Sequence, residues 1–172
     1  MTDFIFIVEA FLDGQGIAHS RDKIGTVAFE LPFGTTSFEC SVNQFGQTLC
    51  VSALWCGVIA PDHINAAQRL LLRLIDAGAQ LGQTHLNPRR GLLKYNSSVD
   101  LGMVDFTIDR VGQVLETLLE PFNIKILAME MALNQKMTAD VVVESYAAWD
   151  RRRIAEMMGR AVDDGPVDPS SN

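Results

Sequence analysis

The side chains best able to do chemistry in this chain are three cysteines and a histidine close to the last of them. The cysteines are Cys40, Cys50 and Cys56, and their Cys-x9-Cys-x5-Cys spacing matches no zinc or thiol-redox pattern. His63 follows seven residues after Cys56 and is a possible base for a reactive thiol, which also needs an electropositive pocket. Because apolar residues surround these cysteines, we expect Cys56 to pack in the core as a small hydrophobe.

Motifs for catalysis, cofactor binding or metal binding do not occur. The histidines His19, His63 and His85 are far apart in the sequence and fit no ligand spacing, so we expect them at the surface or at an interface. The phosphate loop GxxxxGK[ST], the dinucleotide motif GxGxxG and the nucleophile elbow GxSxG are all missing. We therefore predict no catalytic residue, no cofactor, no metal and no enzymatic activity.

Composition is typical of a globular protein from the cell interior. The 172 residues fit one domain with an appended helix, and the net charge of −7 argues against a nucleic-acid partner, because phosphate contacts need a basic surface. No apolar stretch reaches the roughly 18 residues of a membrane helix, and residues 1–4 lack the basic start of a signal peptide. The odd number of cysteines favours reduced thiols. We expect a soluble, cytoplasmic protein without a membrane or nucleic-acid partner.

Apolar periodicity predicts the elements that would position any site. It predicts three strands within 25–57, two more at 80–86 and 92–99, and helices over 3–13, 61–77, from near 105 or 107 to 137, and over 140–162. Short turns join the first three strands, which must therefore pair antiparallel. Pro121 lies inside the long helical run, so a kink or break is expected there. Asp100 is expected to accept backbone hydrogen bonds at the turn before that helix.

The order of these elements indicates an α+β fold built on an antiparallel sheet. It reads α-β-β-β-α-β-β-α, followed by an extra C-terminal helix. We assign residues 1–137 to the α+β domain, 138–162 to the appended helix and 163–172 to a disordered tail. Val143, Ala147 and Ile154 are predicted to form the apolar face of the appended helix.

Residues 36–133 resemble the YbjN family, bacterial proteins described as sensory transduction regulators. The resemblance is carried by Ser37-Phe38-Glu39-Cys40, by Ala60-Pro61-Asp62, and by the stretch that begins Gly91-Leu92-Leu93-Lys94-Tyr95 and ends at Leu101. It implies the fold of type III secretion chaperones, in the same order of elements that the periodicity predicts. The family description implies signalling, the chaperone-like fold implies protein binding, and neither implies an agreed activity.

The absence of catalytic motifs favours a non-enzymatic protein-interaction module, a regulator or chaperone-like binder of another protein. Methionines such as Met131 are dense towards the C-terminus, and methionine adapts well to varied partners. The alternative is a small-molecule-binding sensor with a pocket between the sheet and the long helix, lined by Trp55, Tyr95 and Phe122. A cysteine-dependent enzyme that uses Cys56 is the least favoured hypothesis.

A homodimer is also predicted. Leu70 and Leu72 widen the apolar stripe of helix 61–77 on both sides, beyond the width that one sheet covers. The chaperone-like fold implies an interface through this helix and the next strand, here near Leu81 and His85. In the competing account, the extra C-terminal helix folds back and covers the same leucines.

Overall fold

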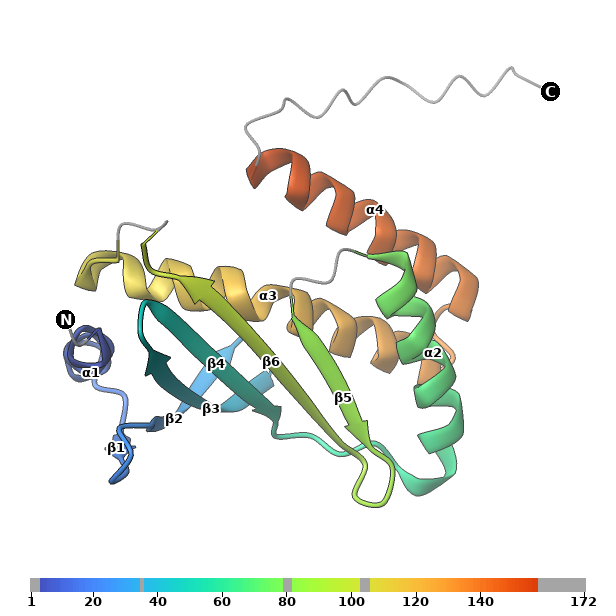
Figure 1. Cartoon of the computed structure of the whole chain (residues 1–172). Coiled ribbons are helices and arrows are strands. Elements are labelled where there is room, and N and C mark those ends of the chain that lie inside the picture. The colour runs from blue at the N-terminus through green and yellow to red at the C-terminus, as the bar shows by residue number, and fades with distance from the viewer. Residues whose placement is uncertain (1–3, 35, 79–81, 103–105, 158–172) are drawn as a thin grey trace.

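The computed structural model describes residues 4–34, 36–78, 82–102 and 106–157, which form a sheet with helices packed against it (Figure 1). Its helices are α1 (Ile5–Gly14), the short 3₁₀ helix η1 (Pro61–His63), α2 (Ile64–Ala77), α3 (Ile108–Leu133) and α4 (Ala139–Met157). Its strands are β1 (His19–Arg21), β2 (Val27–Phe33), β3 (Thr36–Phe45), β4 (Thr48–Trp55), β5 (Gln83–Asn87) and β6 (Leu92–Asp100). The α+β class and the predicted order of elements are confirmed, with β1 as an additional short strand.

The sheet is antiparallel throughout, with the strand order β1-β2-β3-β4-β6-β5. Val51 at its centre pairs with Val42 on β3 and with Ser97 on β6. Side chains alternate between faces along each strand, so β4 buries every second residue from Leu49 to Trp55. On the opposite face the strands carry polar pairs such as Ser52 and Asn96, whose side chains hydrogen-bond at 2.7 Å. One face of the sheet therefore packs in the core, and the other carries polar side chains.

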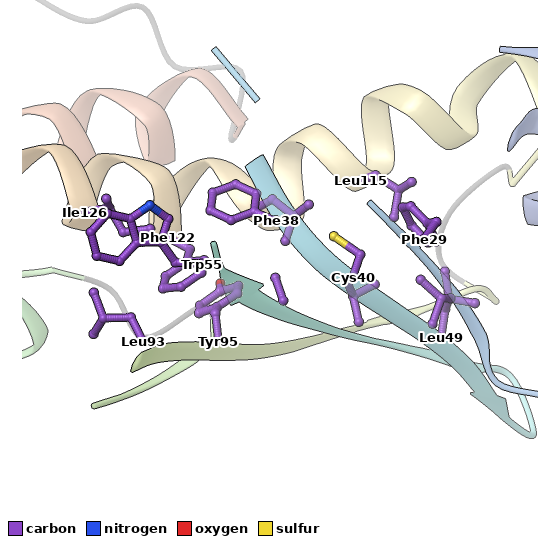
Figure 2. Close-up of a cluster of buried hydrophobic side chains, with 14 of the residues drawn as sticks. Phe29, Phe38, Cys40, Leu49, Trp55, Leu93, Tyr95, Leu115, Phe122 and Ile126 are labelled. Carbon is purple, nitrogen blue, oxygen red and sulfur yellow. The ribbon is translucent and has the colours of Figure 1, made fainter. Parts of the chain in front are cut away.

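Helix α3 crosses the core face of the sheet (Figure 1). It continues from Ile108 to Leu133 through Pro121, so of the expected kink or break, the break does not occur. The proline removes one backbone hydrogen bond, but Leu119 and Phe122 beside it are buried in the core and hold the helix in place. Between sheet and helix, the rings of Tyr95 and Phe122 stack at 5.2 Å with an interplanar angle of 9°. Figure 2 shows these side chains within the main cluster of buried residues.

Helix α4 packs against both α2 and α3, at the end of the sheet where β5 lies (Figure 1). Its buried apolar side chains are those of Val142 and Tyr146, and an ion pair of 2.6 Å joins its Asp140 to Arg73 of α2. The predicted tail at 163–172 lies outside the described residues. Within the described part of the chain, no helix is both long and apolar enough to cross a membrane.

Candidate functional site

An apolar groove runs between α3 and α4, with a volume of about 300 Å³. We call it the α3/α4 groove. Its lining residues are Ile124, Leu127, Ala128, Met131, Met137, Val142, Ser145, Tyr146 and Trp149. A side-chain hydroxyl occurs on two of these residues, Ser145 and Tyr146, so most of the lining is apolar.

The sequence builds the two walls of the groove with the same spacing. Residues 124, 127, 128 and 131 on α3 follow the i, i+3, i+4, i+7 pattern of one helical face, and residues 142, 145, 146 and 149 repeat that pattern on α4. A short connection reverses the chain between them, with Gln135 at a positive φ of 56° and a 2.9 Å bond from Lys136 N to Met131 O. The tight turn therefore holds the two faces side by side.

One large apolar side chain in the lining of the α3/α4 groove is exposed to solvent. Met131 is 39% exposed. Its thioether cannot transfer a proton. What the groove can do chemically is to bury apolar groups of another molecule, and Met131 can change its conformation to fit them.

A cluster of buried charges fixes α4 behind the groove. Arg153 donates a 3.2 Å hydrogen bond to Asp150, and its guanidinium lies 5.2 Å from the ring centre of Trp149. Lys125 of α3, 4% exposed, lies 5.8 Å from the ring centre of Tyr146. Burial lowers the pKa of Lys125, the negative charge of Asp150 opposes that shift, and Arg153 adds to it. The cluster thus positions Tyr146 and Trp149, two lining residues of the groove.

The sequence predicts part of this cluster. The run Arg151–Arg153 points in three directions around a helix and is typical of solvated charge, with Asp150 or Glu156 as pairing partners. In the structure Arg151 and Arg152 are exposed, whereas Arg153 is buried. The available signal was the i, i+3 spacing of Asp150 and Arg153, which allows an ion pair on the same face as Tyr146.

The four residues predicted to bind a partner or ligand do not form one site. Tyr95 and Phe122 are fully buried and stack on each other, so neither presents a surface to a ligand. Met131 lines the α3/α4 groove. Trp55 lines a separate pocket of about 250 Å³, formed by the end of β4, the segment that follows it, the start of β6 and another face of α3.

The residues predicted for a dimer interface also separate. Leu70 is 4% exposed and belongs to the core of its own chain, because α3 and α4 both pack against α2. Leu72 is 62% exposed on the outer side of the same helix. His85 is exposed on β5, and Leu81 lies outside the described residues. Of the two leucines, Leu72 alone offers surface to a second copy.

The structure contradicts one prediction about the thiols. Cys56 is exposed, so its predicted place in the core is wrong: β4 ends at Trp55, and Cys56 lies just past the strand. Cys40 is buried, and burial together with the nearby Cys56 raises its pKa to about 12. All three cysteines are free thiols. Within the described ranges, no group of three or more His, Cys, Asp or Glu residues is arranged to hold a metal ion.

No family model and no curated protein matches the sequence. Solved structures with a similar fold include YbjN from E. coli, at 15% sequence identity and a TM-score of 0.46 over 76% of this chain and 93% of that one. They also include the HopA1–SchA chaperone–effector complex, at 16% identity and a TM-score of 0.37 over 70% of this chain and 93% of that one.

Proposed function

We propose that this protein is a non-enzymatic interaction module, a regulator or chaperone-like binder that receives the apolar face of a short helix from another protein in the α3/α4 groove. One observation carries the proposal: two matched apolar faces line an open groove, with Met131 exposed on one wall. A groove between two helices suits a helical guest, since the guest can lay its own i, i+3, i+4, i+7 stripe between them.

The length of the groove sets the size of the guest. Each wall spans eight residues, from 124 to 131 and from 142 to 149, and the seven steps between its ends make about 10 Å at 1.5 Å per residue. A guest helix would therefore bury about two turns, and two or three of its large apolar side chains would enter the groove. Met131 and Met137 can repack around different side chains, which suits a partner-binding surface.

The test is photo-crosslinking from inside the groove. A photoreactive amino acid replaces Met131 in one variant and Ile24, which is 86% exposed on the turn before β2, in a matched control. A crosslinked protein is then identified, and its contact segment is mapped and synthesised. We expect crosslinks from position 131 and not from position 24, to a segment with an apolar helical stripe. Equal crosslinking from both positions, or a contact segment without such a stripe, would exclude the groove as the binding site.

The homodimer remains a prediction, and one of the two α2 leucines on which it was based is buried within its own chain. With Leu70 buried within its own chain, a symmetric interface through α2 would bury one exposed leucine per subunit, and two leucines contribute roughly 3–6 kcal/mol. Association costs about 4–15 kcal/mol, so Leu72 by itself does not secure a dimer. Light scattering on the full chain and on Leu72→Glu decides the matter. A dimer that dissociates in the variant supports this interface, and a monomer at all micromolar concentrations rules it out.

A further inference from the structure

A second cavity, the Trp55 pocket, lies on a face of α3 different from the one that lines the α3/α4 groove. Its floor is apolar and buried, formed by Trp55, Leu93, Ile126 and Met129. Figure 2 shows Trp55, Leu93 and Ile126 in the buried cluster at the core face of the sheet. Polar side chains among the lining residues belong to His63, Glu130 and Asn134.

Close backbone approaches hold this pocket in shape. Gly57 lies against the indole of Trp55, so closely that a Cβ there would sit 2.7 Å from Cη2 and nearer still to two other ring atoms. The indole is oriented by a 2.8 Å hydrogen bond from its Nε1 to Thr36 Oγ1. Gly91, at a φ of +64°, packs against Ile59, whose N–H donates to the Gly91 carbonyl at 2.9 Å. The pocket is therefore formed before any ligand arrives.

The charge of the pocket selects among possible ligands. Glu130 is the one acidic side chain among the described lining residues, and none of those residues is a lysine or an arginine. His63 also lines the pocket, and its Nε2 atom lies 3.9 Å from the carboxylate of Asp62, a residue outside the lining. An anionic ligand would meet the Glu130 carboxylate, whereas a cation would find a partner in it.

The size of the pocket limits the ligand to a small molecule. A volume of about 250 Å³ exceeds the roughly 150 Å³ of an apolar protein cavity that binds benzene. We propose that the Trp55 pocket binds a small amine, with an aromatic ring or short apolar chain on the buried floor and a protonated amino group at Glu130. The proposal is independent of partner binding in the α3/α4 groove, because the two sites use different residues of α3.

The chain carries two tryptophans, so Trp149→Phe leaves Trp55 as the single reporter of its pocket. Three probes are compared: phenethylamine, 3-phenylpropionate, which reverses the charge, and ethylamine, which lacks the ring. We expect a saturable change in Trp55 emission with phenethylamine, and weaker binding of the other two probes. Calorimetry on the unaltered full chain repeats the comparison, so that the result does not depend on how Trp149→Phe folds.

Glu130→Gln supplies the residue-level test, with Glu144→Gln on the exposed side of α4 as its matched control. We expect Glu130→Gln to weaken phenethylamine binding about five-fold and Glu144→Gln to leave it unchanged, since a partly exposed charge pair contributes modestly. Binding of phenylpropionate as tight as that of phenethylamine would overturn the proposal. So would equal affinities in the two variants, or the absence of saturable heat with the unaltered chain.

Discussion

Gly57 is the position where adding one methyl group should disturb the protein most clearly. In Gly57→Ala the new Cβ would overlap the Trp55 indole, which is 8% exposed and tied to Thr36 through its Nε1. Overpacking costs about 1–3 kcal/mol, and losing the indole hydrogen bond adds about 0.5–1.5 kcal/mol. The free energy of unfolding should therefore fall by roughly 2–4 kcal/mol, which corresponds to a melting temperature lower by about 4–16 °C.

Urea and thermal unfolding measure this loss, with Gly14→Ala as the control. Gly14 ends α1, and a Cβ added there meets no heavy atom within 4 Å. Alanine is the better helix former by about 1 kcal/mol, so the control should be as stable as the unaltered protein or slightly more so. If Gly57→Ala unfolds at the same urea concentration as Gly14→Ala, with unchanged Trp55 emission, the indole does not lie against Gly57 and the argument for a preformed pocket fails.

Three further predictions concern single side chains. Tyr146→Phe removes a buried hydroxyl that has no hydrogen-bond partner among the described residues, so stability at pH 7 should be unchanged or higher by about 1 kcal/mol. Burial raises the pKa of Tyr146 because the folded state disfavours the phenolate, so the free energy of unfolding should fall as the pH rises above about 10, and alkaline unfolding curves of Tyr146→Phe should lack that loss. Cys56 should react with a thiol reagent in the native protein and Cys40 only after denaturation, since burial raises the pKa of Cys40 to about 12; mass spectrometry of labelled peptides tests both. Asp100→Ala removes the 2.8 Å hydrogen bond from Gly102 N to Asp100 Oδ1, confirmed in the structure, and should cost about 1 kcal/mol in urea unfolding.

Most of the fold could be predicted because its elements carry strong local signals. Alternating apolar residues and short turns define β2, β3 and β4. In β6, alternation places Leu93, Tyr95 and Ser97 on one face, and that face is the buried one. Strand β1 was missed because His19, Ser20 and Arg21 show no apolar alternation and are ordered by pairing with β2. The break expected at Pro121 does not occur, because tertiary packing on both sides of the proline outweighs its local effect.

The candidate site was harder to predict, because it depends on which helix faces meet. The outer face of α3 with Ile124, Leu127 and Met131 could be recognised as a second apolar stripe. On α4, the predicted apolar face of Val143, Ala147 and Ile154 is half-buried, and the fully buried face includes Asp150 and Arg153. Apolar periodicity cannot identify a face that is buried through an ion pair. The burial of Leu70 likewise depends on packing with other helices, which the sequence of α2 does not specify.

The affinity of the chain for the helical segment mapped by crosslinking tests the central claim most directly. Fluorescence anisotropy with the labelled synthetic peptide compares the unaltered protein, Met131→Glu and Ile24→Glu, after melting curves have shown that all three fold. We predict that Met131→Glu weakens binding at least about tenfold, which is about 1.4 kcal/mol, because the guest helix would bury an unpaired charge. Ile24→Glu should bind like the unaltered protein. Equal affinities in all three proteins would contradict the assignment of the α3/α4 groove as the partner-binding surface.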